Sequence, residues 1–382
     1  MKPVLFVTGH APRDRLGAFA RLHEQENVVF ALFGGRTKHG VDPPVSPNRG
    51  RGAIRNGAHA ESHLSASDLP FPHIRVRQQE LTQLAASGDY RGVVCSTGGR
   101  VALPATWLGA RRARVPLLLW TSLWAHPRSP AHVLSYPMLR RLYRSADALV
   151  TYGPHVSAYV RAWGARNVHE APQSVDNDFW SASGCAPPSA PCWPTAARTK
   201  FLFAGRPARE KGLGVLLEAW CASGLGGSTA ALVLVGAGSC PPWIPAGGAA
   251  DVLCLDAVTP EELRNMYAAG DVLVLPSIRT RTFLEPWGLV VNEAMNRRLA
   301  VVASDAVGAV AGGLVRDGEN GLVVPAGDSD ALSAAMVRLA ADLQLRARLG
   351  QCGAEDVRAY SHRAWAEGFS RALSSLDLSL ES

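Results

Sequence analysis

FLFAGRPAREKGLGVLLEAW, residues 201–220, carries the pattern on which the fold prediction depends. Its apolar run Phe201–Ala204 shows no polar alternation, which predicts a strand buried on both faces. A turn containing Gly205 and Gly212 follows, and a helical stretch comes after it. Strands of this kind, separated by helices, predict a parallel sheet that helices cover on both sides.

Similar apolar runs recur along the chain in two series. The first comprises Val4–Thr8, Val28–Phe33, Gly92–Ser96, Pro116–Trp120, Ala148–Tyr152 and Val168–Ala171, and the second Phe201–Ala204, Ala231–Val235, Val252–Leu255, Val272–Pro276, Val301–Ala303 and Leu322–Val324. A length of 382 residues also suits two domains. We therefore predict an α/β protein with two doubly wound, Rossmann-like domains. The segment SASGCAPPSAPCWPTAART, residues 181–199, is rich in Pro, Ala and Ser and is predicted to link them.

A second motif, FLEPWGLVVNEAM at residues 283–295, has the composition of a phosphate and sugar site. Pro286 suits the first position of a helix, which would leave Glu285 at the mouth of the site. The backbone amides that would then point outward and attract phosphate are those of Trp287, Gly288 and Leu289. Glu293, further along, has a carboxylate that can accept two hydrogen bonds from a ribose diol. A surface helix with an acidic first turn explains the pair of glutamates equally simply.

The stretch 283–327 resembles the retaining glycosyltransferases of family 4. The resemblance rests on two glutamates with seven residues between them, a Val-rich strand at Ala300–Ser304 and the turn Asn320-Gly321. The resemblance implies that Glu285 faces the donor sugar and Glu293 the ribose. It also implies that Arg206 and Lys211, which are five positions apart, bind the diphosphate of a UDP- or GDP-type sugar donor and stabilise its charge without an obligatory metal or other cofactor. A solvated basic turn is the alternative account of these two cations.

Over nearly its full length the chain resembles enzymes of GT-B architecture, in which two Rossmann-like domains face a cleft. This implies an acceptor-binding domain at 1–180, a nucleotide-sugar domain at 200–354, and a C-terminal helix in 355–382 that returns to the first domain. The candidate helix Ala354–Leu376 carries the apolar stripe Tyr360, Trp365, Phe369 and Leu373, which favours packing. Such an enzyme would transfer a sugar with retention to a hydroxyl of a glycan, a glycolipid or a small molecule.

The resemblance is weaker in the first domain, where VTGHAPRDRLGAF offers Gly9 as the loop glycine after the first strand. Family members place a histidine after a strand in the middle of the first domain. His126, in LLLWTSLWAHPR, is the preferred candidate for this histidine, and His10 is the second candidate. Either histidine is also compatible with an ordinary loop position. Trp120 and Trp124 suit a platform for a sugar ring, although core packing is the simpler account.

Two loops of the second domain also bear on donor recognition. The loop Ile278–Leu284 is longer than in the family and offers Arg279 and Arg281 to an acidic donor sugar or to the acceptor, with a solvated loop as the simpler account. Base recognition is expected near Asp256–Val258 by analogy.

Charge is distributed unevenly along the chain. Residues 1–180 hold 22 Lys and Arg against 12 Asp and Glu, whereas residues 181–382 hold 17 against 20. A basic first domain suits an anionic acceptor or an anionic membrane surface. The stretch Pro137–Ala148 mixes arginines with apolar residues as an interfacial helix does, although a solvated basic helix is the simpler account. No nucleic-acid-binding module is recognisable, so nucleic acid is not an expected partner.

Seven cysteines without a CxxC pair predict reduced thiols and a cytoplasmic protein, peripheral at the membrane at most. The first residues lack a signal-peptide pattern, and no apolar run reaches the ~18 residues of a membrane span. The eleven histidines show no metal-ligand spacing.

Two other kinds of protein are compatible with the same motifs. One is a different GT-B enzyme, such as a sugar-nucleotide epimerase or a phosphorylase. A phosphorylase would need a pyridoxal-binding lysine, and the chain has only four lysines to supply it. The other is a non-catalytic subunit that binds a nucleotide sugar.

Overall fold

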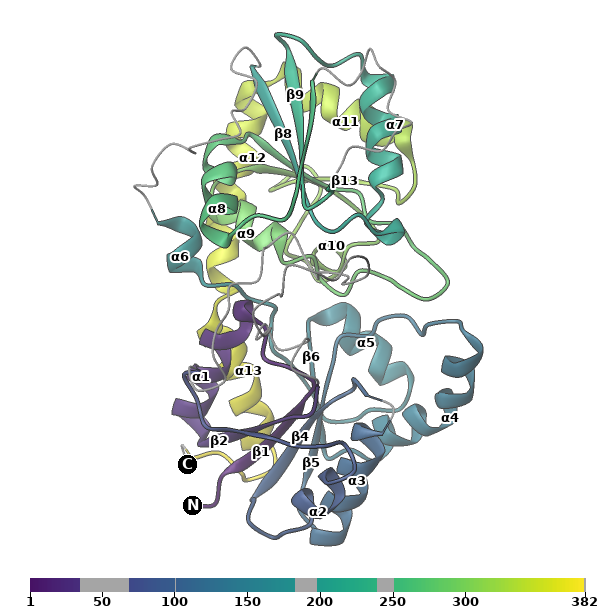
Figure 1. The fold of residues 1–382 in the computed structure, drawn as a ribbon, viewed down its shortest axis with the longest axis vertical. Helices are drawn as coiled ribbons and strands as arrows, with labels where there is room; N and C mark the ends of the chain where they lie inside the picture. Colours follow the sequence, from purple (N-terminus) through teal and green to yellow (C-terminus); the bar gives the residue numbers. More distant parts are fainter. Residues whose placement is uncertain (35–68, 100, 183–197, 239–250, 381–382) are drawn as a thin grey trace, which may run out of the picture. The chain divides into compact units, whose positions relative to one another are not determined.

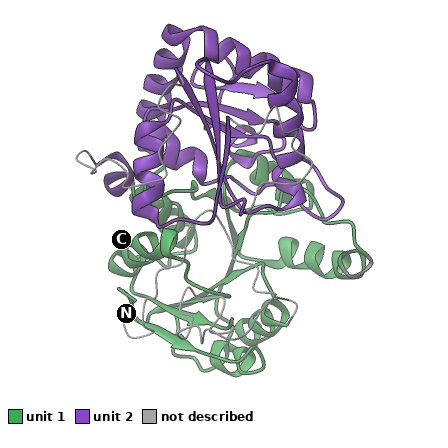
Figure 2. Cartoon of the chain, turned by 45° about the horizontal axis from the view of Figure 1, so that its top comes forward, with its two compact units in different colours: residues 1–50, 62–176, 360–382 green, residues 51–61, 177–359 purple. Residues whose placement is uncertain are grey.

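The computed structural model describes residues 1–34, 69–99, 101–182, 198–238 and 251–380. The described chain divides into two compact units (Figure 2). Unit 1 contains residues up to Asp176 together with the C-terminal segment from Tyr360, and unit 2 contains residues Asn177–Ala359. Most of the predicted linker lies outside the described residues; its ends belong to a helix that closes at Ser181 and a strand that opens at Thr199.

Unit 1 is built on a seven-stranded parallel sheet in the order β3-β2-β1-β4-β5-β6-β7 (Figure 1). The strands are β1 Val4–Thr8, β2 Val28–Leu32, β3 His73–Arg75, β4 Gly92–Ser96, β5 Leu117–Thr121, β6 Ala148–Thr151 and β7 Val168–Glu170. In β1, Val4 and Phe6 enter one apolar core while Leu5 and Val7 enter another. Both faces of the sheet are therefore buried, which explains why its strands show no polar alternation.

The helices of unit 1 are η1 Arg13–Arg15, α1 Leu16–Glu26, α2 Leu81–Ala85, α3 Ala102–Ala113, α4 Pro130–Ser145, α5 Pro154–Ala162 and α13 His362–Ser374. The last of these packs on α1 although the two are far apart in sequence (Figure 1). Trp365, Phe369 and Leu373 are at most 1% exposed and join Phe6 and Phe19 in one core. The C-terminal stripe is thus a packing surface, as its spacing indicates.

Unit 2 has a six-stranded parallel sheet in the order β10-β9-β8-β11-β12-β13. Its elements are α6 Asn177–Ser181, β8 Thr199–Ala204, η3 Arg209–Lys211, α7 Leu213–Ser223, β9 Ala230–Val235, β10 Val252–Leu255, α8 Pro260–Ala269, β11 Val272–Leu275, α9 Val290–Asn296, β12 Ala300–Ser304, α10 Gly308–Ala311, β13 Leu322–Val324, α11 Ser329–Ala341, α12 Leu343–Asp356 and η4 Val357–Ala359. In both sheets the connection reverses direction at one place, between β1 and β4 in unit 1 and between β8 and β11 in unit 2. The predicted fold class of two doubly wound Rossmann-like units is confirmed.

The secondary structure differs from the prediction at three places. Pro286 does not begin a helix, because α9 starts at Val290. The carbonyl oxygens of Glu285 and Trp287 accept instead from the amides of Gly308 and Ala309, at 3.1 and 2.8 Å, and this pairing holds the segment out of helical geometry.

The C-terminal stretch is not one helix either. It contains the end of α12, the short turn η4 and α13, so Tyr360 precedes the helix on which it was expected to lie. The third difference is β3, a strand of three residues that pairs with β2 at one edge of the sheet that the described residues form. Its sequence HIR has no apolar run that could have revealed it.

The cysteines differ from the expectation of seven reduced thiols. Cys254 in β10 is disulfide-bonded, whereas Cys95, Cys221 and Cys352 are free. Burial raises the pKa of Cys95 to about 12, so this thiol stays protonated and unreactive. Among the helices of the described ranges, none is both long enough and apolar enough to span a bilayer.

Candidate functional site

The predicted donor-site residues of unit 2 lie in two loops that leave neighbouring strands. Arg206 and Lys211 follow β8, and Glu285 follows β11. Since β8 and β11 pair in parallel, both loops emerge at the carboxyl edge of the sheet. This is the point where the strand order reverses, and it is where open α/β sheets bind ligands.

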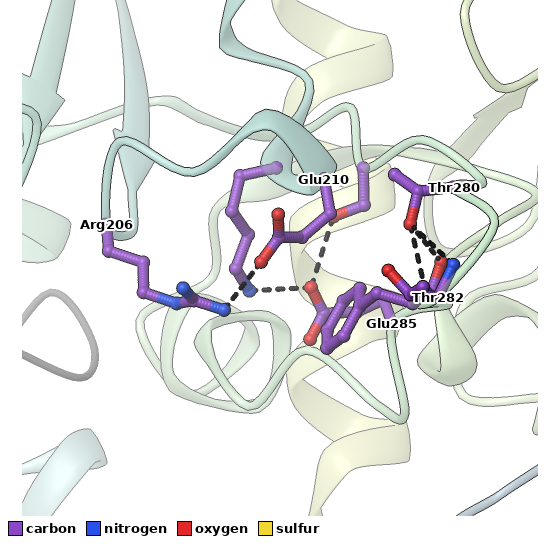
Figure 3. A network of polar contacts seen from close by, with 8 residues as sticks. Arg206, Glu210, Thr280, Thr282 and Glu285 are labelled. Atoms are coloured by element: carbon purple, nitrogen blue, oxygen red, sulfur yellow. Dashed lines mark hydrogen bonds and ion pairs between the residues drawn. The ribbon is translucent and has the colours of Figure 1, made fainter. Parts of the chain in front are cut away.

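Two ion pairs organise these loops (Figure 3). Lys211 Nζ donates to Glu285 Oε2 at 2.6 Å, across 74 positions of sequence. Arg206 Nη2 donates to Glu210 Oε1, also at 2.6 Å, within its own loop. The Glu285 carboxylate is only 8% exposed and accepts a second hydrogen bond from Ser277 Oγ at 3.2 Å. The structure therefore brings Lys211 and Glu285 together and gives each predicted cation a carboxylate partner.

Gly212 is the position where the two loops meet most closely. A Cβ there would lie 1.9 Å from the carbonyl oxygen of Pro276, and the residue has φ +70°. Ile278 N also donates to Glu210 O at 2.9 Å. The glycine thus permits the approach that puts Lys211 within reach of Glu285.

Glu293 lies in the first turn of α9 and is 3% exposed. Its Oε2 accepts from the hydroxyl of Tyr267 in α8 at 2.9 Å. Burial, followed by the Glu293 charge, raises the pKa of Tyr267 well above its ordinary value, so the phenol remains a donor at neutral pH. Tyr267 therefore fixes the orientation of the glutamate.

The three residues expected to offer amides precede α9 rather than open it. Trp287 is 2% exposed, and its Nε1 donates to Asn292 Oδ1 at 2.8 Å, so its side chain belongs to the core. Gly288 has φ +92°, and a Cβ there would lie 2.6 Å from Leu275 Cδ2. Leu289 caps α9. The helix therefore begins four residues later than predicted, and these amides belong to the turn that leads into it.

The loop before Glu285 is organised by Thr280 (Figure 3). The Thr280 hydroxyl donates to Phe283 O at 3.1 Å and accepts from Phe283 N at 2.9 Å. Arg279 lies 3.7 Å from the Asp305 carboxylate, in a pair that is exposed to solvent. Arg281 and Asp256 are exposed, at positions open to a ligand.

In unit 1 a cavity of about 750 Å³ lies at the corresponding reversal point. It is lined by the ends of β1 and β4, with Gly9 and His10 on one side and the pair Gly98-Gly99 on the other. Gly9 has no positive φ, and a Cβ there would make only ordinary contacts. Gly99, by contrast, has φ +93°, so the glycine that the backbone requires is in the β4 loop.

Arg15 is a buried cation in the wall of this cavity. Its guanidinium lies 5.0 Å from the Trp120 ring centroid and 5.4 Å from that of Tyr152, and it donates to Gln173 Oε1. Trp120 is 7% exposed, and its Nε1 is buried without a hydrogen-bond partner in the described chain. The cavity wall therefore combines aromatic surface and a positive charge, and one of its residues, Trp120, holds a buried donor without a partner in the described chain.

His126 does not line this cavity. Its Nε2 donates to His132 O at 2.9 Å, and its ring meets Tyr136 edge-on at 4.4 Å, so it packs against α4. Because a carbonyl can only accept, the proton of the neutral ring is on Nε2. Trp124 likewise packs, edge-on against His155 at 5.1 Å.

Replacing His126 by alanine is expected to lower the free energy of unfolding by about 1–2 kcal/mol, because both the hydrogen bond and the aromatic contact are lost. A denaturant titration measures this loss. Arg112→Ala, at an exposed position of unit 1, is the control and should unfold at the wild-type midpoint. A large fall in kcat of His126→Ala at unchanged stability would instead assign this histidine to the reaction.

Several residues of the two sites were not predicted from the sequence. Ser277 and Tyr267 give no local signal, since a serine after a strand and a tyrosine in an amphipathic helix are common. Arg15 looks like a surface residue beside Asp14. The glycine pair Gly98-Gly99, directly after an apolar strand, was a visible turn signal that could have located the cavity.

The fold is that of the GT-B glycosyltransferases. The structure of Anabaena HepE in complex with UDP and glucose has a TM-score of 0.71 at 16% identity, covering 98% of this chain and all of that one. Sucrose-phosphate synthase from Thermosynechococcus elongatus has a TM-score of 0.69 at 20% identity, covering 99% of both chains. At these identities the likeness concerns the fold alone.

A match to a protein family falls within unit 2. Residues 198–342 match the family described as glycosyl transferases group 1. Alpha-D-kanosaminyltransferase of Streptomyces kanamyceticus is 32% identical over 159 residues, 40% of this chain and 39% of that protein. Phosphatidyl-myo-inositol mannosyltransferase of Mycobacterium leprae is 34% identical over 194 residues, 50% of this chain and 49% of that protein. The chain thus spans half or less of the length of these curated relatives.

Proposed function

We propose that the protein is a retaining glycosyltransferase that moves a sugar from a nucleotide-diphosphate donor to a hydroxyl group of an acceptor. The observation that carries the proposal is the Lys211–Glu285 pair, in which a cation and a buried carboxylate meet at the strand-order reversal of unit 2. The names of the relatives, which include a mannosyltransferase and a kanosaminyltransferase, support glycosyl transfer. The UDP and glucose bound by HepE support a donor of this kind.

In the proposed donor complex, the diphosphate competes with carboxylates for two cations. Arg206 would exchange Glu210 for a phosphate oxygen, and Lys211 would share its ammonium between Glu285 and the diphosphate. Both cations then neutralise charge as the bond from the anomeric carbon to the phosphate oxygen breaks. Glu285 would face the donor sugar, and Glu293, held by Tyr267, would accept hydrogen bonds from the ribose diol.

The acceptor oxygen forms the new bond on the same face of the sugar from which the diphosphate departs. Its proton passes to the departing phosphate oxygen, so no protein nucleophile is needed. The enzyme contributes positioning and charge stabilisation. We expect turnover to continue in excess EDTA, since the two side-chain cations supply the neutralising charge.

A panel of UDP- and GDP-sugars, with free diphosphate measured after incubation, tests the proposal. Slow hydrolysis of one donor, accelerated by an added glycan, glycolipid or aglycone and yielding a product with retained anomeric configuration, is the expected result. Interconversion of the sugar without diphosphate release would instead indicate an epimerase. Donor binding with no turnover for any acceptor class would indicate a non-catalytic subunit.

We further propose that the cavity of unit 1 receives the acceptor. Its volume of about 750 Å³ admits a sugar-sized polyol, and the unsatisfied Trp120 Nε1 would donate to one of its oxygens.

Trp120→Phe keeps an aromatic ring at this position and removes the indole donor, so the acceptor KM should rise about fivefold while the donor KM stays constant, because one neutral hydrogen bond is lost. Steady-state kinetics with each substrate varied in turn make the measurement. Trp124→Phe, outside the cavity lining, is the matched control. An unchanged acceptor KM in Trp120→Phe would place the acceptor elsewhere.

A further inference from the structure

Helix α4, Pro130–Ser145, exposes apolar side chains to an unusual extent. Leu134 is 83% exposed, Val133 61% and Met138 40%. Leu134 and Met138 are four positions apart and so lie on one face of the helix, and Val133 adjoins Leu134. Figure 1 shows α4 at the outer edge of unit 1. An exposed leucine alone is ordinary, but three neighbouring apolar residues on one helix face need a reason.

The same face continues as a basic patch in the second half of α4. Arg140, Arg141 and Arg144 are exposed and line a hollow of about 370 Å³ together with Tyr136, Pro137 and Ser145. The helix contains no Asp or Glu. In the described part of the chain, none of these three arginines takes part in an ion pair.

Two of the arginines are held in place by neighbouring structure. The Arg140 guanidinium lies 5.8 Å from the Trp163 ring centroid. The stem of Arg144 lies against Gly164, where a Cβ would come within 2.9 Å of its Cγ. The positive groups are therefore partly ordered around the hollow, rather than spread as long solvated side chains.

We propose that α4 is an interfacial helix that docks unit 1 on an anionic lipid bilayer. Val133, Leu134 and Met138 would enter the boundary of the acyl chains, and the three arginines would bind headgroup phosphates beside the hollow. A bilayer surface presents an apolar layer of acyl chains and a charged layer of headgroups, and the apolar and basic groups on one face of α4 match these two layers. The excess of basic residues in 1–180 adds long-range attraction of the same sign. This inference goes beyond glycosyl transfer and stands without it.

Co-sedimentation with vesicles tests the proposal on the full chain. We expect partition onto phosphatidylcholine vesicles that contain about one-third phosphatidylglycerol, and none onto pure phosphatidylcholine. Binding should fall as salt is raised from about 0.02 to 0.5 M, because the Debye length contracts below the spacing of the charges. Equal binding to both vesicle types, or no binding to the anionic vesicles at low salt, overturns the proposal.

Variants separate the two halves of the helix face. Leu134→Gln should lower the partition coefficient about tenfold, since one buried leucine is lost. The triple variant Arg140→Gln, Arg141→Gln, Arg144→Gln should lower it about 100-fold, since each arginine near anionic lipid contributes about fivefold.

Each variant has a matched control elsewhere in the molecule. Leu343→Gln changes another exposed leucine, which is 67% exposed on α12. The triple variant Arg112→Gln, Arg338→Gln, Arg358→Gln removes the same charge from exposed sites outside α4. If this triple control loses as much vesicle binding as the α4 triple variant, the loss is explained by net charge, and a role for α4 is contradicted. Donor hydrolysis and thermal unfolding, followed on every variant, separate loss of docking from loss of the fold or of the proposed reaction.

Discussion

Replacing Lys211 by alanine is expected to lower kcat about 10²- to 10³-fold, because a positive group that stabilises the leaving diphosphate is lost. The same change should also lower the stability of unit 2 by about 3 kcal/mol. Glu285 is buried, and this variant removes the cation that balances its negative charge. Single-turnover rates and a denaturant titration measure the two effects separately.

A double variant distinguishes loss of catalysis from loss of folding. Lys211→Ala combined with Glu285→Gln removes both charges, so stability should recover by more than half while kcat stays low. Lys2→Ala, at an exposed lysine of unit 1, is the control and should leave both quantities unchanged. A double variant that recovers wild-type turnover would remove Lys211 from the reaction. Glu285→Ala should lower turnover with little effect on the donor KM, and wild-type kinetics would contradict its proposed position beside the donor sugar.

Replacing Glu293 by alanine is expected to raise the donor KM about 100-fold, because two charge-assisted hydrogen bonds to the ribose are lost. Glu293→Gln, which keeps one acceptor and no charge, should raise it about tenfold. Tyr267→Phe should raise it about fivefold, since the glutamate loses the donor that orients it, and kcat should stay near the wild-type value. Initial rates at saturating acceptor make the comparison, with the deoxyribose analogue of the donor as a second substrate.

The deoxyribose donor gives this prediction its control. If Glu293 binds the ribose hydroxyls, Glu293→Ala should discriminate between ribose and deoxyribose donors far less than the wild-type enzyme does. Glu293→Ala also leaves the buried Tyr267 hydroxyl without its acceptor, so Tyr267→Phe in that background should cost little further stability. An unchanged ribose preference in both Glu293 variants would show that the carboxylate serves only to hold Tyr267.

The sequence predicted the sheets well because burial on both faces leaves a strong local signature. Continuous apolar runs marked the central strands to within one or two residues at each end. β3 was missed because an edge strand with one partner needs little apolar surface. The expected helix start at Pro286 was wrong because local proline geometry was outweighed by the pairing of Glu285 with Val307, which no local pattern encodes.

The candidate site was only partly predictable for the same physical reason. Arg206, Lys211, Glu285 and Glu293 could be named from motif spacing, but their partners could not. Ser277 and Tyr267 reach the two glutamates from other elements. His126 had the expected place in the chain, yet its ring turns toward α4 rather than into the cavity of unit 1.

The amino-acid sequence by itself determined the two parallel-sheet units and the residues that can carry charge and hydrogen bonds to a donor, because burial patterns and turn residues act over a few neighbouring positions. Only the tertiary structure decided that Lys211 meets Glu285 across 74 positions, that Tyr267 holds Glu293, and that Trp120 keeps an unsatisfied donor beside a buried arginine. These contacts depend on the order in which strands pair in the sheet. The strand order is set by the packing of the whole unit, so no short stretch of sequence encodes it.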